Sequence, residues 1–343
     1  MKIIDFEEFA QLESLIEKLK PYADIEVVAH APGKEKSYPI YVIRMGSSTK
    51  NVPTIGYFSG VHGLERIGSK VLLSYLSTII ELMPWDHMLH SILKHIQFVF
   101  MPIVNPAGMY QQTRSNSNGI DLMRNAPIDS DIVRWYHVWG GHRVSKYLPW
   151  YRGKAGKPME IEAQALCDVV KKYLLPSKVS LAVDLHSGFG KQDQLWFPYA
   201  HTRKPFPYIA QALELKKKLD QAYPFHVYRY EPQSIRYQSH GDLWDYLFYE
   251  HEKRAPEHFF MPLTLELGSW AWLKKSPKHI FSSLGIFNPM EEHRRQRTFR
   301  RHLVLFDFLT RAVVSHEKWV NLDKNKQQDL YRQALQLWGL TDE

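Results

Sequence analysis

Cysteine is almost absent from this chain, in which Cys167 is the only one among 343 residues. A single cysteine excludes an internal disulfide and any metal cluster held by several thiolates, so a metal site would have to use histidine and carboxylate side chains. Long apolar runs are absent too, since no stretch approaches the roughly 20 apolar residues of a membrane-spanning helix. Residues 1–20 contain acidic side chains and apolar residues at helical spacing, which predicts a folded helix and not a secretory signal. We therefore expect a soluble, cytoplasmic protein that does not associate with membranes.

Acidic residues are outnumbered, with 36 Asp and Glu against 44 Lys and Arg, which gives a formal net charge of +8. The basic residues are dispersed except for a run in 293–301, and this run precedes an apolar segment in 303–314. We interpret the run as the solvated face of a helix and do not expect the protein to bind nucleic acid. Nothing in the composition indicates the oligomeric state.

Short apolar segments alternate with helical patterns along most of the chain. The segments read as strands end near turn-forming or polar residues, at 52–60, 95–104, 179–188 and 260–268, and a hairpin is expected at 25–46. Helical periodicity is found at 69–83, 158–175, 291–318 and 324–338. This order predicts an α/β fold with a mixed, mostly parallel sheet sandwiched by helices. We expect one domain over 1–343, with a helical C-terminal extension of approximately 276–343 packed on it.

Three residues suited to a metal lie where predicted strands end. His62 and Glu65 follow one strand at a spacing of three, and His186 ends another. Ligands of parallel sheets gather at the carboxyl ends of the strands, so these side chains are expected to meet. His-x-x-Glu alone is weak support, because a chain with 17 histidines should contain about one by chance. A rival group without a carboxylate at ligand spacing is interpreted as surface residues: His87, His90 and His95.

Several motifs in a fixed order resemble one known family. They are GVHGLE, NPAGM, RSNSNGIDLMRN, YRGKAGKPMEIEAQAL, DLHSGFG and TLELG. In order and spacing they are similar to motifs of the zinc carboxypeptidases of the carboxypeptidase A type, and the chain looks like a bacterial-type member. The resemblance runs from the N-terminal helix to about Ser269, roughly three quarters of the chain. It implies the family's fold and its zinc-dependent hydrolysis.

The resemblance also implies roles for single residues. His62, Glu65 and His186 would hold one zinc ion per chain, and Asp121 would orient the ring of His62. Glu266 would be the general base that activates the metal-bound water. A salt bridge is the structural alternative for this glutamate, because a carboxylate in the apolar strand PLTLELG needs a partner when it is buried.

A second group of residues would bind the substrate. Arg114 matches the arginine that stabilises the oxyanion, and Arg124 the one that grips the terminal carboxylate of the substrate. Tyr237 best matches the mobile tyrosine, with Tyr246 as the second candidate, and Asn125 completes the motif of Arg124. At Met123 the chain departs from the family, which has an asparagine there, and a thioether cannot donate that hydrogen bond. Candidates for the side-chain pocket are Asp242, Leu243 and Trp244.

Three functions are therefore compatible with the sequence. The leading hypothesis is a zinc metallocarboxypeptidase that cleaves a peptide or amide bond near a free carboxylate of a small peptide. The second keeps the metal but makes the chain a deacylase or amidase acting on acylated amino acids or cell-wall peptides. The third is a catalytically silent peptide-binding or nucleic-acid-binding protein on the same fold, which Met123 and the positive charge would suit, although such a protein has no need of Glu266.

Overall fold

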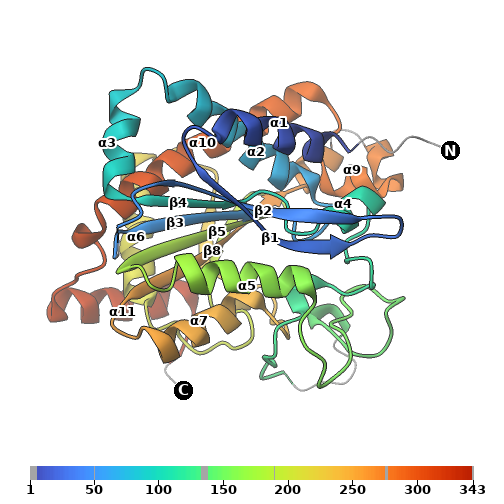
Figure 1. The fold of residues 1–343 in the computed structure, drawn as a ribbon. Coiled ribbons are helices and arrows are strands. Elements are labelled where there is room, and N and C mark those ends of the chain that lie inside the picture. The colour runs from blue at the N-terminus through green and yellow to red at the C-terminus, as the bar shows by residue number, and fades with distance from the viewer. Residues whose placement is uncertain (1–5, 50, 133–137, 189, 275–276, 342–343) are drawn as a thin grey trace.

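The central feature of the fold is an eight-stranded sheet with helices on both faces (Figure 1). The structure, a computed structural model, describes residues 6–49, 51–132, 138–188, 190–274 and 277–341. In sheet order the strands are β1 (Asp24–Pro32), β2 (Ser37–Gly46), β4 (Gln97–Met101), β3 (Thr54–Ser59), β5 (Val179–Gly188), β8 (Phe259–Gly268), β6 (Gln194–Phe197) and β7 (Arg229–Pro232). The central strands β4, β3, β5 and β8 are parallel, whereas β1, β2 and β6 add antiparallel pairings. The predicted mixed, mostly parallel α/β sheet is confirmed.

Helices cover the two faces of this sheet in separate layers (Figure 1). One face carries α1 (Glu7–Leu19), α2 (Arg66–Leu82), α3 (His87–His95) and α10 (Glu292–Val314). The other carries α5 (Ile161–Tyr173) and α7 (Leu243–Arg254). Because both faces are covered, the central strands are apolar almost throughout, and every residue of β3 is buried.

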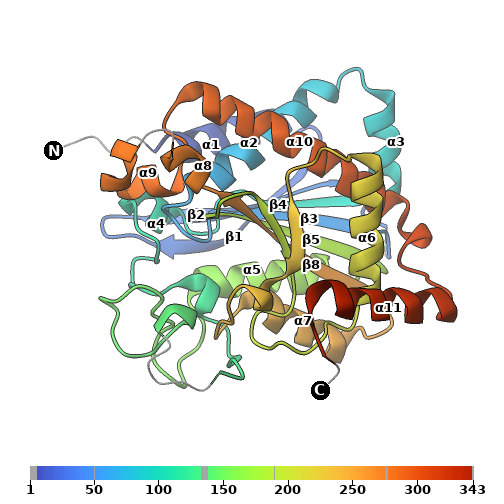
Figure 2. The same ribbon diagram turned by 180° about the vertical axis from the view of Figure 1, so that it is seen from behind.

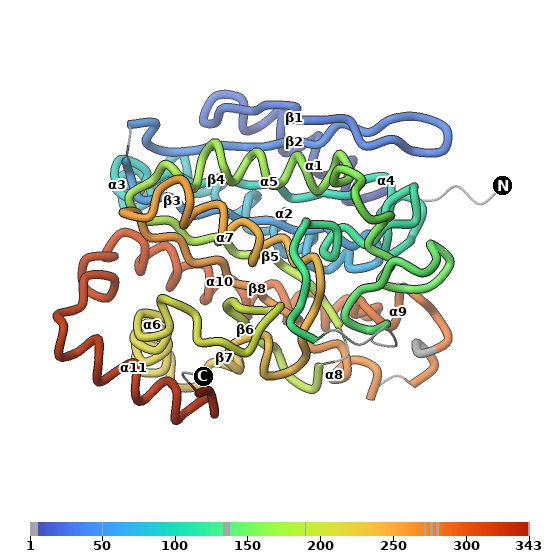
Figure 3. The backbone as a smooth tube through the Cα atoms, turned by 90° about the horizontal axis from the view of Figure 1, so that it is seen from below, coloured from blue at the N-terminus to red at the C-terminus, as the bar shows by residue number. Residues whose placement is uncertain are grey.

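The two long helices of the C-terminal region pack on different parts of the molecule. Helix α10 packs on α2 and on the sheet, whereas α11 (Lys324–Trp338) packs on α6 (Ile209–Ala222) (Figure 2). The ring of Trp338 lies 5.0 Å from that of Phe197 in β6, which fixes α11 beside the edge of the sheet. The short α9 (Ser283–Phe287) lies on the side of the sheet where the loops of 115–160 gather (Figure 3).

The remaining elements are short. They are α4 (Pro106–Gln111), α8 (Trp270–Leu273), η1 (Leu122–Arg124), η2 (Val138–Gly140), η3 (Gln233–Ile235), η4 (Pro277–Phe281) and η5 (His316–Lys318). Most of them border the loops at that side, whereas η5 follows the end of α10 on the opposite side of the sheet (Figure 3). None of the described helices is both long enough and apolar enough to cross a membrane.

Candidate metal centre

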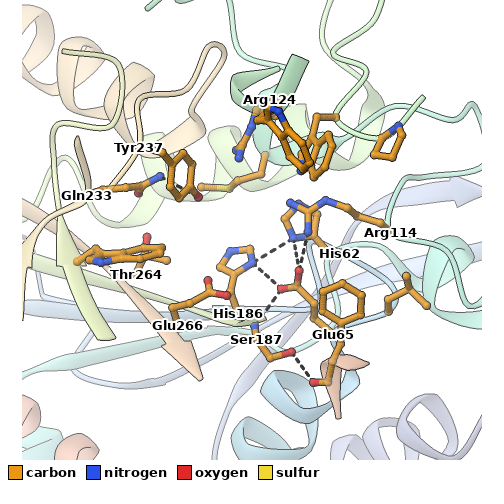
Figure 4. A pocket seen from close by; sticks show the side chains of 18 residues that line it. His62, Glu65, Arg114, Arg124, His186, Ser187, Gln233, Tyr237, Thr264 and Glu266 are labelled. Carbon is orange, nitrogen blue, oxygen red and sulfur yellow. Dashed lines mark hydrogen bonds and ion pairs between the residues drawn. The ribbon is translucent and has the colours of Figure 1, made fainter. Parts of the chain in front are cut away.

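Three side chains from two strand ends meet in a buried candidate metal site, which we call the metal site and define as His62, Glu65 and His186. Nδ1 of His62 lies 2.8 Å from Oε1 of Glu65, and Nδ1 of His186 lies 2.9 Å from Oε2 of the same carboxylate. The two Nδ1 atoms are 3.2 Å apart (Figure 4). All three residues are at most 3% exposed. The structure therefore brings together the three residues that the sequence singled out as ligands.

The chemistry of these donors fits a cation. Nε2 of His62 faces Asp121 at 3.0 Å and Nε2 of His186 faces Asp184 at 2.8 Å, so each ring donates its Nε2 proton to a carboxylate. Both Nδ1 lone pairs then point toward the Glu65 carboxylate and toward each other. Such a set of acceptors repels itself unless a proton or a cation lies among them. Two imidazoles and one carboxylate with an open fourth position are the donor set of a catalytic zinc site.

The loop that carries His62 is fixed by the Asn105-Pro106 turn. Asn105 caps α4 by accepting from the N–H of Gly108 at 2.8 Å, and its amide donates to the carbonyl of Val61 at 3.2 Å. Gly63 lies so close to this turn that a Cβ there would be 2.1 Å from the backbone of Gly108. The NPAG motif thus positions the metal-ligand loop, which explains why a glycine is needed next to His62.

Glu65 stands where α2 begins, yet it makes no side-chain cap. Its carboxylate turns toward His186 and also accepts the backbone N–H of Ser187 at 3.1 Å. Burial acts to raise the pKa of Glu65, but the nearby histidines His62 and His186 outweigh it and hold that pKa well below its usual range. The carboxylate is therefore charged and available to a cation.

Asp184 and Trp244 are functional neighbours of the metal site that the sequence analysis did not assign to it. Asp184 is fully buried and its Oδ2 accepts both from His186 and, at 2.9 Å, from Nε1 of Trp244. The only sequence signal was an acidic residue two positions before His186 on the same strand, which points to the same face as the histidine. Trp244 belongs to α7, and no sequence pattern indicated that it contacts Asp184 next to the metal site.

Glu266 lies beside His186 because the two residues are register partners on the parallel strands β5 and β8. Among the described residues Glu266 has no ion pair and no hydrogen bond, so the salt bridge that was its structural alternative is absent there. Burial, together with the charge of Glu65, raises the pKa of Glu266 to about 8. A cation in the metal site would act in the opposite direction.

Arg114 bridges Glu65 of the metal site and Asp121, the carboxylate that faces His62. Its Nη1 donates to Oε1 of Glu65 and its Nε to Oδ2 of Asp121, both at 2.9 Å. Burial acts to raise the pKa of Asp121, but Arg114 and His62 outweigh it and keep the pKa far below its usual range. Nη2 of Arg114 makes no hydrogen bond to a described residue, and the residue lines the cavity described next.

A cavity of about 620 Å³, the metal cavity, opens over the metal site. On one side of His186 its wall carries Tyr237, Gln233 and Thr264, whereas Arg114 lies on the other side (Figure 4). The predicted substrate residues Arg124, Met123 and Tyr237 all line it. Arg124 is buried, makes no ion pair with a described residue, and lies with its guanidinium 5.8 Å from the ring of Tyr237.

The loop of residues 128–151, which is rich in aromatic residues, also contributes to this wall. Trp139 and Trp150 line the metal cavity and their rings are 4.9 Å apart. Trp135 and Tyr136, which belong to the same loop, lie outside the described residues. The C-terminal region contributes as well, because Phe287 lines the cavity and its carbonyl accepts from the Ser187 hydroxyl at 2.7 Å.

Other predicted substrate residues do not reach the metal cavity. Asn125 uses both ends of its amide on backbone groups, donating to the carbonyl of Arg152 at 3.1 Å and accepting from the N–H of Glu160 at 2.6 Å. It therefore supports the fold of its loop. The candidates for a side-chain pocket are at most 2% exposed and none lines the cavity, because they begin a helix packed on the sheet: Asp242, Leu243 and Trp244.

Comparison with known proteins agrees with this geometry. The profile of the zinc carboxypeptidase family matches residues 35–274, so the chain belongs to that family of metallocarboxypeptidase-type hydrolases. Carboxypeptidase B2 of Bos taurus is 23% identical over 196 residues, which cover 53% of this chain and 44% of that protein. The inactive metallocarboxypeptidase ECM14 of Arthroderma otae is 29% identical over 172 residues, covering 47% of this chain and 28% of that protein. The resemblance inferred from the motifs is confirmed.

Similarity to solved structures extends over more of the chain. Bovine thrombin-activatable fibrinolysis inhibitor, solved in complex with tick carboxypeptidase inhibitor, matches with a TM-score of 0.65 at 18% identity and covers 90% of this chain and 96% of that one. A match over nine-tenths of the chain must include part of 276–343, so this region is not wholly an addition to the shared fold. In sequence, the chain spans less than half the length of the relatives given above.

Proposed function

We propose that this protein is a zinc-dependent hydrolase that cleaves a peptide or amide bond next to a free carboxylate, with one zinc ion per chain. The observation that carries the proposal is the position of Glu266, an unpaired carboxylate next to the metal ligand His186. Glu266 is partly exposed where it lines the metal cavity, so water can reach its oxygens. A general base must keep its oxygens free for water.

The chemistry of the site follows from its donors and charges. When bound, zinc supplies Lewis-acid polarisation of a carbonyl and lowers the pKa of water toward neutrality. Glu266 takes a proton from the attacking water and returns it to the leaving nitrogen. Nη2 of Arg114 donates to the carbonyl oxygen as that oxygen becomes negative.

Recognition of a carboxylate rests on Arg124. This residue is a buried cation without an ion pair to any described residue, so a substrate carboxylate would be its counterion. Tyr237 is 38% exposed beside it and packs edge-on against Trp196, with 6.0 Å between the ring centroids. An exposed phenol next to a cation can add a hydrogen bond to the bound carboxylate.

Met123 favours a second candidate, a deacylase or amidase with the same metal chemistry. It lines the metal cavity at the position where the family has an asparagine. A thioether cannot donate a hydrogen bond, so the site has one donor fewer for the C-terminal carboxylate of a peptide. A silent peptide-binding protein is the third candidate, since the name of the relative ECM14 describes an inactive metallocarboxypeptidase. The free carboxylate of Glu266 speaks against it.

Metal content and hydrolysis, measured on the same preparations, test the proposal. The substrates are peptides with a free C-terminus, the same peptides with a blocked C-terminus, and N-acylated amino acids. Glu266→Gln should bind as much zinc as the parent and lose activity by about 10²- to 10⁴-fold. Glu257→Gln, at an exposed glutamate outside the cavity, is the matched control and should keep full activity.

Each outcome of these measurements distinguishes among the three candidate functions. Cleavage of free peptides alone supports the carboxypeptidase, and cleavage of blocked or acylated substrates supports the second candidate. Zinc binding without turnover of any substrate would leave the silent binding protein. A parent protein that binds no zinc would refute the proposed metal site.

A further inference from the structure

A second large cavity lies near the metal cavity and has a different character. It encloses about 650 Å³ and is bordered by the segments 118–127, 143–146 and 151–164. We call it the basic pocket. One acidic side chain, Glu160, lines it together with five cationic ones: Arg143, Lys146, Arg152, Lys154 and Lys157.

Most of this positive charge is not neutralised by the described part of the protein. Arg152 is internal: it pairs with Asp129 and donates to backbone carbonyls. The other four cations, Arg143, Lys146, Lys154 and Lys157, are exposed and form no ion pair with any described residue. The carboxylate of Glu160, whose Oε2 accepts from the amides of Asn116 and Asn118, offsets only one of these charges, so the pocket keeps a net positive charge.

A smaller cavity of about 200 Å³ lies between the basic pocket and the metal cavity and borders both, so we call it the connecting cavity. This connecting cavity shares Arg114, Pro149 and Trp150 with the metal cavity. It shares Lys146 and Tyr151 with the basic pocket. The connecting cavity therefore adjoins the metal cavity on the side of Arg114.

Arg114 and Tyr237, one of the two proposed carboxylate-binding residues, lie on different sides of the metal site. Tyr237 is on the far side of His186 as seen from Arg114 (Figure 4). A substrate whose terminal carboxylate is held at Arg124 and Tyr237 would thus send its preceding residues past Arg114. Those residues would run through the connecting cavity toward Lys146.

We propose that the basic pocket binds an acidic segment of a peptide substrate, several residues before the bond that is cleaved. This inference rests on the proposed function, because it uses the direction in which the substrate lies across the metal site. Carboxylates of Glu or Asp side chains would pair with the unpaired cations and raise the affinity at low salt. A peptide suits the pocket better than a nucleic acid, because the positive charge is gathered around one cavity near the metal cavity and does not extend along a groove that could follow a phosphate backbone.

Binding to an uncleaved peptide tests the inference without turnover. The protein is zinc-loaded Glu266→Gln, and the probes are fluorescently labelled peptides with the same C-terminal residue, preceded either by glutamates or by glutamines. The glutamate peptide should bind about tenfold or more tightly than the glutamine peptide at low salt. Adding Lys154→Glu and Lys157→Glu should abolish this difference, and the milder pair Lys154→Gln and Lys157→Gln should reduce it.

The matched control places the same charge change elsewhere. Lys318 and Lys324 are exposed, without ion pairs to described residues, and they lie on η5 and at the start of α11, away from the loops of 115–160 (Figure 3). Lys318→Glu with Lys324→Glu should keep the preference for the glutamate peptide.

Three outcomes would overturn the inference: equal affinity for both peptides, an equal loss in the control variant, or stronger competition by a single-stranded oligonucleotide than by the glutamate peptide. Failure of the proposed function is distinguishable, since it would appear as a parent protein that cleaves no peptide while the glutamate peptide still binds selectively. Conversely, cleavage without any preference for acidic peptides would remove this inference and leave the proposed function intact.

Discussion

Gly188 lies directly against the carboxylate of Glu266, and a Cβ at position 188 would be 2.3 Å from Oε1 of that glutamate. The two residues are on adjacent strands, with His186 two positions before the glycine and in register with Glu266. A glycine here leaves the carboxylate the space that it occupies beside the metal site. The sequence DLHSG therefore positions both the candidate ligand His186 and the proposed general base from one strand.

Gly188→Ala is expected to move this carboxylate and so to lower kcat/KM by about 10²-fold, because a displacement of about 1 Å at a reacting group has such an effect. Zinc content should be unchanged, since no ligand is touched. Gly190→Ala is the control, because a Cβ there would come no closer than 3.1 Å to another atom. Equal activity of both variants and the parent would show that Glu266 is not held by this contact.

Asp184→Asn should weaken zinc binding by about tenfold to 100-fold, because the carboxylate that orients His186 and makes its ring more basic loses its charge. Trp244→Phe should give a smaller loss, since it removes the donor that fixes the carboxylate. Competition with a chelator of known affinity measures both. If neither variant changes zinc affinity, the contact between Asp184 and His186 serves packing alone.

Met123→Asn restores the amide that the family carries at this position and should lower KM for peptides with a free C-terminus by about tenfold, which corresponds to one hydrogen bond to a charged group. Peptides with a blocked C-terminus should not benefit. Met123→Leu keeps the shape and adds no donor, so it controls for packing. An unchanged KM for free peptides would mean that the cavity does not place a carboxylate next to Met123.

Features that depend on residues close together in the sequence could be predicted, whereas features that depend on contacts between distant segments could not. Local sequence patterns predict the strands and the candidate ligands His62, Glu65 and His186. The order of the motifs was sufficient to place Glu266 with them. The position of Asn125 was missed because its amide is used by Arg152 and Glu160, which no local pattern shows.

Contacts between segments that are far apart in the chain could not be predicted from the sequence either. Trp244 reaches Asp184 from a helix 60 residues further along the chain. Asn288 reaches the metal-ligand loop across more than 200 residues. Such contacts depend on how helices pack on the sheet, and the hydrophobic pattern of a helix gives only its buried face.

Asn288 gives the C-terminal region a measurable role at the metal site. Its side chain accepts from the N–H of Ile67 and donates to the carbonyl of Leu64, both at 2.8 Å, and so holds the two ends of the turn around Glu65. Asn288→Ala should lower the free energy of unfolding by about 1–3 kcal/mol, because buried backbone groups lose their partners. It should also weaken zinc binding. Urea denaturation and chelator competition measure the two effects, and a change in neither would contradict the role.

A buried pair of carboxylates at the start of α7 should make stability depend on pH. Asp242 caps this helix through Oδ1, while its Oδ2 has no partner among the described residues. The neighbouring Asp245 accepts three hydrogen bonds, from the N–H groups of Ala200 and His201 and from the ring of His201. Burial and the charge of Asp245 raise the pKa of Asp242 from 3.8 to about 7.

The sign of the effect follows from proton binding. Between pH of about 4 and about 7 the folded protein keeps a proton on Asp242 that the unfolded chain has released, so stability falls as the pH rises through this window and stays lower above it. Asp242→Asn keeps the capping oxygen and removes the titration. Its stability relative to the parent should therefore increase by on the order of 2 kcal/mol from about pH 5 to about pH 8. Urea denaturation at both pH values measures it, and Asp86→Asn, at the more exposed cap of α3, controls for the loss of a capping carboxylate. A difference between Asp242→Asn and the parent that is the same at both pH values would mean that Asp242 is already charged in the folded protein at the lower pH, and that its burial is compensated by the surrounding donors.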